Sequence, residues 1–235
     1  MAKFEEKYTI MNKTLRNSII ISILVIGIIF ILIVKFIGPL MADEARHIDH
    51  SDLISYIEDG DIIFQTSKSS QSKAIQIATN SKYSHLGIIY KIGGKCFVYE
   101  AVQPVKLTLL NEWIKRGENG HFVIKRLKNS EEILTDEVKN RMKTEGEKFR
   151  GKNYDLYFEW SNDRIYCSEL VWKIYKNAAN IEIGKLQKLG EFNLKNKIVM
   201  QKLNERYGNN IPKDEIVISP SSMFESEKLN TIYKE

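Results

Sequence analysis

The chain has 235 residues, of which 43% are hydrophobic and 28% charged, and it carries a formal net charge of +5. This composition, with only four prolines, is that of a folded protein and excludes a disordered or collagen-like chain. Residues 1–42 hold five Lys or Arg and two Glu, so the rest of the chain is close to neutral, which argues against nucleic-acid binding. Two cysteines cannot form a disulfide framework.

An uncharged apolar run covers Ser18–Val34 and continues beyond Lys35. About 20 helical residues span the roughly 30 Å of a bilayer core, and the long stem of Lys35 reaches the head groups. The run therefore predicts a single transmembrane anchor over 18–41; the alternative is a cleaved signal peptide, whose apolar region is usually about 7–15 residues. Basic residues precede the run and acidic residues follow it. The positive-inside rule then predicts a cytoplasmic tail over 1–17 and an extracytoplasmic domain.

A tether over 42–57 leads into the predicted folded domain, residues 58–235. Asp61–Phe64 follows an Asp-Gly turn and is the first predicted strand. A serine-rich stretch then precedes a short helix with apolar residues at 74, 75, 77 and 78, capped by a serine. Strands at His85–Tyr90 and Cys96–Val102 are separated by two glycines, which predicts a hairpin.

The second half of the domain is predicted to be richer in helices. The apolar positions 170, 171, 174 and 175 follow one helical stripe that starts at Cys167. The other predicted elements are a helix capped by Thr108, a strand over 121–127 with Phe122 and Ile124 on one face, a helix over 135–152, a helix over 195–207, and a strand over 215–218 ended by a proline turn. The sum is an α+β fold, a small antiparallel sheet packed with helices.

Three residues form a candidate reacting group. His85 begins an apolar strand, and Cys167 begins a helix, where unpaired N–H groups and the helix dipole favour a thiolate. A cysteine nucleophile also needs a base, which a third polar group must hold in the right orientation. Glu100 suits that role, because the predicted hairpin brings it close to His85.

The motifs "GDIIF", "SHLGIIY", "VYEAV" and "YCSELVWKIY", in this order, resemble those of the circularly permuted papain-fold cysteine hydrolases, in the YiiX-like branch of the NlpC-type peptidase and amidase superfamily. The resemblance spans roughly residues 58–225. It implies that Cys167 is the nucleophile, His85 the general base and Glu100 the orienting residue. Tyr166 matches an aromatic often found before the cysteine, and "ISPSSMFES" resembles a closing proline and short helix.

Several residues keep two interpretations. Tyr154, Tyr157, Phe158 and Trp160 either line a substrate cleft or cover the cysteine helix; Tyr154, Trp160 and Tyr166 are the predicted substrate-binding residues.

Cys96 is expected in the core, with a disulfide to Cys167 as the less favoured alternative. His47 and His50 are expected on a solvated helix rather than at a metal. His121 is expected to have no chemical role, and Asp61 a structural one.

The resemblance, together with the predicted anchor, implies a membrane-anchored hydrolase of amide bonds that works through an acyl-enzyme and needs no metal or organic cofactor. Its substrate would be a peptide, such as a cell-wall peptide, or an amidated or acylated amino acid. Two alternatives remain open. One is a thiol acyltransferase or lipid-acyl hydrolase of the same fold, and the other is a non-catalytic module that binds a peptide or amino acid.

Overall fold

The computed structural model describes residues 51–235, whose compact unit runs from Leu53 to Glu235. The predicted tail, the membrane anchor and the histidines of the tether lie outside the described residues. Across residues 51–235, no helix has the length and apolar character needed to cross a membrane.

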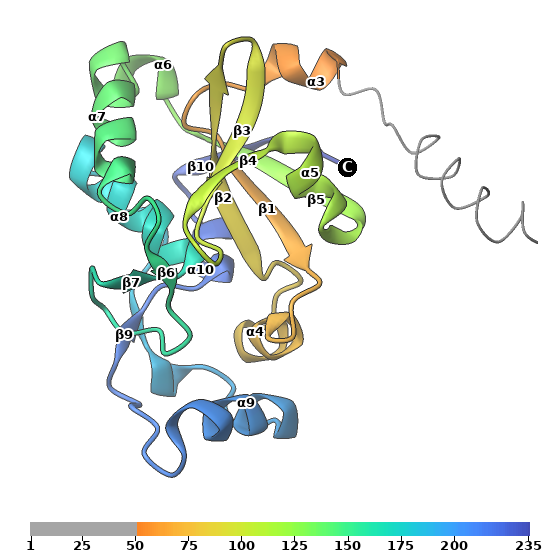
Figure 1. Cartoon of the computed structure of the whole chain (residues 1–235), viewed down its shortest axis with the longest axis vertical. Coiled ribbons are helices and arrows are strands. Elements are labelled where there is room, and N and C mark those ends of the chain that lie inside the picture. The colour runs from red at the N-terminus through yellow and green to blue at the C-terminus, as the bar shows by residue number, and fades with distance from the viewer. Residues whose placement is uncertain (1–50) are drawn as a thin grey trace, which may run out of the picture. The chain divides into compact units, whose positions relative to one another are not determined.

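A six-stranded antiparallel sheet forms the centre of the unit, in the order β10-β5-β1-β2-β3-β4 (Figure 1). The strands are β1 (Ile62–Ser67), β2 (His85–Ile92), β3 (Lys95–Glu100), β4 (Lys106–Leu109), β5 (Gly117–Leu127) and β10 (Leu229–Lys234). The hairpin of β2 and β3 turns at Gly93 and Gly94, whose φ angles of 55° and 75° suit glycine. The predicted α+β fold with a small antiparallel sheet is confirmed.

The sheet buries both of its faces, because apolar residues alternate along its strands. Ile88 of β2 joins a cluster with α7 (Asp136–Glu147) and α8 (Cys167–Ala179), whereas its neighbour Ile89 joins a second cluster with α5 (Leu110–Lys115). Figure 1 shows α7 and α8 on one side of the sheet and α5 on the other. Phe122 and Ile124 share the second cluster, as predicted.

The second cluster also buries the start of the unit. Leu53 lies in α3 (Ser51–Tyr56), and Ile57 follows that helix. They are 3% and 0% exposed and pack with residues of β1, β2 and β5. The apolar contacts therefore begin within the segment that was predicted as tether.

Helix α8 is the element that fixes the position of Cys167. Leu170, Val171, Ile174 and Tyr175 are all fully buried, as their helical spacing predicted. At its start, the main-chain N–H of Tyr166 donates to the Glu169 side chain at 3.5 Å. Cys167 is thereby the first residue of the helix.

Two predicted helix caps are wrong. The N-cap of helix α4 (Ser72–Thr79) is Gln71, and no side chain caps the helix; Ser72 is its first residue, and its hydroxyl bonds that of Ser84 at 2.6 Å. Helix α5 begins after Leu109 without a side-chain cap. Thr108 donates instead to the Glu100 carboxylate at 2.6 Å, a charged acceptor that makes the stronger hydrogen bond.

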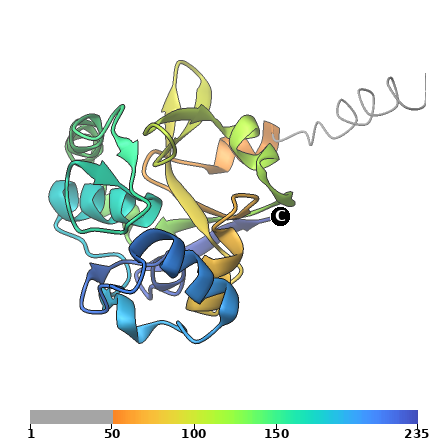
Figure 2. The same cartoon turned by 60° about the horizontal axis from the view of Figure 1, so that its bottom comes forward.

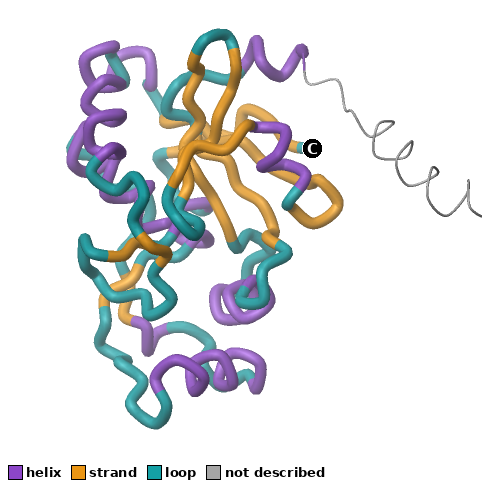
Figure 3. The backbone as a smooth tube through the Cα atoms, viewed as in Figure 1, coloured by secondary structure: helices purple, strands orange, loops and turns teal. Residues whose placement is uncertain are grey.

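A third, smaller apolar cluster joins α4 to α9 (Lys197–Tyr207), which lie side by side in Figure 2. The chain between α8 and α9 is mostly loop (Figure 3). The predicted terminal strand is confirmed as β9 (Ile216–Val217), followed by α10 (Pro220–Phe224) with proline in its first turn. The remaining short elements are α6 (Ser130–Ile133), β6 (Asn153–Tyr154), β7 (Arg164–Ile165), β8 (Gln187–Lys188) and the 3-10 helix η2 (Leu189–Glu191).

Candidate active site

The register of β2 and β3 brings His85 and Glu100 together. Ile88 lies opposite Tyr99, so Gly87 faces Glu100 and His85 lies near the end of β3. The distance from His85 Nε2 to Glu100 Oε2 is 2.7 Å. The contact expected from the predicted hairpin is present.

Glu100 is fully buried and receives three donors. His85 donates to Oε2, while Thr108 and Arg116 both donate to Oε1. Burial acts to raise the pKa of Glu100, but the hydrogen bonds and charges of His85, Thr108 and Arg116 outweigh it and hold the pKa below its usual value. Glu100 is therefore ionised at neutral pH.

The ring of His85 lies beside Cys167 and is stacked on Trp113 with 5.9 Å between ring centroids. Burial alone would lower the pKa of His85, but the hydrogen bonds and negative charges of Cys167 and Glu100 raise it to about 9. Because Nε2 is bound to Glu100, Nδ1 is the nitrogen left for the sulfur. The site therefore favours the protonated form of the His85 ring.

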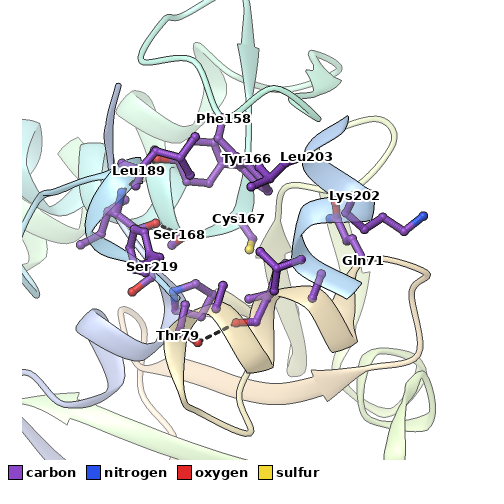
Figure 4. A pocket seen from close by; sticks show the side chains of 18 of the residues that line it. Gln71, Thr79, Phe158, Tyr166, Cys167, Ser168, Leu189, Lys202, Leu203 and Ser219 are labelled. Atoms are coloured by element: carbon purple, nitrogen blue, oxygen red, sulfur yellow. Dashed lines mark hydrogen bonds between the residues drawn. The ribbon is translucent and has the colours of Figure 1, made fainter. Parts of the chain in front are cut away.

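Cys167 carries a free thiol at the N-terminus of α8. The N–H groups of a first helical turn have no acceptor within the helix, and the dipole there favours negative charge. Figure 4 shows the sulfur pointing into a pocket, which Cys167 lines together with Phe158 and Tyr166. Cys96 is also a free thiol and is buried in the α5 cluster, so the alternative of a disulfide is wrong.

Tyr154 lies beside the thiol, and Gln71 contacts Tyr154. Gln71 Nε2 donates to the Tyr154 hydroxyl at 2.9 Å, and Arg206 donates to Gln71 Oε1 at 2.6 Å. Burial, followed by the negative charge of Cys167, raises the pKa of Tyr154 well above its usual value. The phenol therefore keeps its proton beside the sulfur. Gln71 was not among the predicted site residues.

Of the four aromatic residues for which the sequence left two interpretations open, two line the pocket and two do not. Tyr154 and Phe158 line the pocket, as does Tyr166. Trp160 does not line it but packs against Trp172 at 5.3 Å, beneath the Lys173 ammonium.

Tyr157 likewise packs away from the pocket, against Tyr207. His121 lies within β5 and stacks on Tyr83. The buried Asp61 forms an ion pair with the partly exposed Arg126 at 2.7 Å, which is the structural role expected of it.

Three comparisons with known proteins give one picture. A family model described as "Permuted papain-like amidase enzyme, YaeF/YiiX" matches residues 56–233. The YiiX protein of Escherichia coli, described as uncharacterized, is 48% identical over 176 residues, which cover 75% of this chain and 86% of YiiX. A crystal structure of Escherichia coli YiiX, described there as a metalloprotein, matches with a TM-score of 0.73 and 48% identity over 77% of this chain and 98% of its own.

The description of that relative raises the question of a metal site here. Within residues 51–235, no group of three or more His, Cys, Asp or Glu side chains is arranged to hold a metal ion. What the comparisons establish is the family: this chain belongs to the permuted papain-like amidases of the YaeF/YiiX type.

Proposed function

We propose that the chain is a cysteine hydrolase that cleaves amide bonds through an acyl-enzyme, with Cys167 as nucleophile, His85 as acid and base, and Glu100 as the residue that orients the ring. The observation that carries the proposal is the buried 2.7 Å contact between Glu100 and His85, beside a free thiol that opens to a pocket. Membership in an amidase family supports the choice of bond.

The proposed reaction has two steps, acylation of Cys167 and hydrolysis of the resulting thioester. The thiolate of Cys167 adds to the substrate carbonyl, the C–N bond breaks, and His85 gives its proton to the departing amine. His85, now neutral, removes a proton from water, and the resulting hydroxide adds to the thioester. The C–S bond then breaks, which releases the acid and restores the ion pair.

Two features lower the barrier to these steps. Glu100 keeps Nε2–H in place, so that Nδ1 faces the sulfur throughout. The oxyanion of each tetrahedral intermediate would be met by the Cys167 N–H and by the Tyr154 hydroxyl, the second donor beside the sulfur. The proposed steps draw on no metal or organic cofactor.

A thiol-directed probe tests the proposal against a module that only binds. We expect iodoacetamide to label Cys167 in the wild-type protein and in Cys96→Ala. Cys167→Ala should show no label in the pocket, and His85→Ala should be labelled at Cys167 more slowly than wild type. Cys96→Ala is the matched control, because Cys96 lies in the other cluster. If wild type stays unlabelled between about pH 6 and 9, the binding module is the better explanation.

We also propose that residues 18–41 anchor the protein in the cell membrane as a single span, with the N-terminus in the cytoplasm and the catalytic domain outside. The length of the apolar run and the basic residues before it support this placement. Protease added to intact cells should digest the domain. A domain protected until the cells are lysed would contradict the proposed orientation.

A further inference from the structure

The hydroxyl of Tyr154, the proposed second oxyanion donor, has only one proton to give. A phenol oxygen donates one hydrogen bond and can accept others, so its use as a donor depends on the direction in which the O–H bond points. The sulfur of Cys167 lies beside this hydroxyl. Two residues from other elements, Gln71 and Arg206, bear on the direction of the proton.

The side chain of Gln71 meets the hydroxyl as a donor. Gln71 is the N-cap residue of α4 and lines the same pocket as Cys167 (Figure 4). Its Nε2 donates to the Tyr154 oxygen at 2.9 Å. This bond uses a lone pair of the phenol oxygen, and an amide N–H cannot accept the phenol's proton in return. The hydroxyl must therefore donate in another direction, and Cys167 lies beside it.

Arg206 fixes which end of the Gln71 amide faces Tyr154. A guanidinium carries five donors and no acceptor, so it can bond only the oxygen of an amide. Arg206 donates to Gln71 Oε1 at 2.6 Å, which leaves Nε2 on the side of Tyr154. If the amide were reversed, two donors would oppose each other at Arg206, and Oε1 would accept the proton of Tyr154.

Arg206 is itself held by two contacts. It lies in the last turn of α9, whose Leu203 belongs to the same apolar cluster as Ala74 of α4. Its guanidinium carbon is 5.0 Å from the centroid of the Phe158 ring, a distance typical of a cation–π contact. The contacts therefore form one chain, from α9 through the start of α4 to the hydroxyl of Tyr154.

We propose that Gln71 and Arg206 are positioning residues, which direct the hydroxyl proton of Tyr154 toward the oxyanion that forms at Cys167. This inference rests on the proposed function and adds to it two residues that act through Tyr154 rather than on the reacting atoms. Helix α9 takes part in the reaction through Arg206.

The variant Gln71→Glu separates this role from packing. A glutamate has nearly the same shape and can form an ion pair with Arg206, so the fold should be kept. Its carboxylate only accepts hydrogen bonds, so it takes the proton of Tyr154, and the oxyanion loses that donor. With p-nitrophenyl acetate, an activated ester, we expect kcat to fall about 100-fold with KM nearly unchanged, as in Tyr154→Phe.

Three further variants serve as controls, and thermal unfolding checks that each is folded. Lys73→Gln makes the same change in charge at an exposed position of α4 and should leave kcat as in wild type. Arg206→Lys keeps a cation that only donates and should retain most of kcat. Arg206→Met releases the amide of Gln71 and should lower kcat toward that of Gln71→Glu.

The double variant Gln71→Glu/Tyr154→Phe tests whether Gln71 acts through the phenol. It should be no slower than Tyr154→Phe alone, because the hydroxyl that Gln71 directs is gone. Wild-type kcat in Gln71→Glu, an equal loss in Lys73→Gln, or a full second loss in the double variant would overturn the inference. If the wild-type protein is neither acylated by the ester nor labelled by iodoacetamide at Cys167, the hydrolase itself is wrong.

Discussion

At the scale of single residues, Glu100 bears a buried negative charge that contacts the ring of His85, the proposed acid and base. Glu100→Gln keeps the shape of the side chain but removes the charge that favours imidazolium. We expect kcat/KM to fall about 100-fold, within the range typical of general acid–base catalysis. Thr108→Val is the matched control: it removes one 2.6 Å donor to the same carboxylate, keeps the charge, and should cost far less. Equal losses in both variants would argue that Glu100 serves packing alone.

The titration of His85 gives a second prediction at this scale. Its pKa is raised to about 9, so the imidazolium is present below that pH and is lost as pH rises through it. Amide hydrolysis should fall above about pH 9, because the leaving amine needs the proton of His85. Alkylation by iodoacetamide should not fall, because it requires only the thiolate.

Glu100→Gln provides the control for that pH profile. Glu100 is one of the causes that raise the pKa of His85, so the alkaline limb of hydrolysis should move to lower pH in the variant. The apparent pKa read from this alkaline limb describes the interacting pair of thiol and imidazole rather than one group alone. Parallel loss of hydrolysis and alkylation above about pH 9 would show that His85 is not the acid.

At the scale of elements, the approach of β2 and β3 depends on Gly87. A Cβ atom there would lie 2.4 Å from Val98 Cγ1 and 2.7 Å from the Tyr99 carbonyl oxygen. Gly87→Ala should therefore push the strands apart, cost about 1–3 kcal/mol in the free energy of unfolding, and separate His85 from Glu100. Urea unfolding and kcat/KM measure the two effects. Ile92→Ala, at the exposed end of β2, is the control and should change neither the free energy of unfolding nor kcat/KM. If Gly87→Ala also leaves both quantities unchanged, the strands tolerate a wider spacing.

The elements that were predictable from the sequence are those with local patterns. The pair of glycines predicted the hairpin that brings His85 to Glu100. The apolar stripe from Leu170 to Tyr175 predicted α8. Both caps were predicted wrongly, since tertiary contacts of Ser72 and Thr108 outweigh local capping.

Gln71 was missed for a different reason. Its hydrogen bonds join it to Tyr154 and Arg206, 83 and 135 positions away along the chain, and no local pattern encodes such contacts. Trp160 and Tyr154 looked equivalent in sequence, and only packing separates the residue against Trp172 from the residue beside the thiol. The candidate trio of Cys167, His85 and Glu100 could be proposed from the order of the motifs, but the residues that line the pocket could be identified only from the fold.

At the scale of the whole molecule, the buried start of the unit predicts where the domain can be cut. Leu53 and Ile57 complete the cluster on the α5 side of the sheet, so a fragment of residues 51–235 should unfold cooperatively and keep its activity on small amides. A fragment of residues 58–235 lacks both side chains, and losing their burial should cost about 3 kcal/mol or more in the free energy of unfolding. Urea titration of the two fragments, at equal concentration and pH, measures the difference. If the two fragments were equally stable, α3 and the rest of the segment before residue 58 would contribute nothing to the free energy of unfolding.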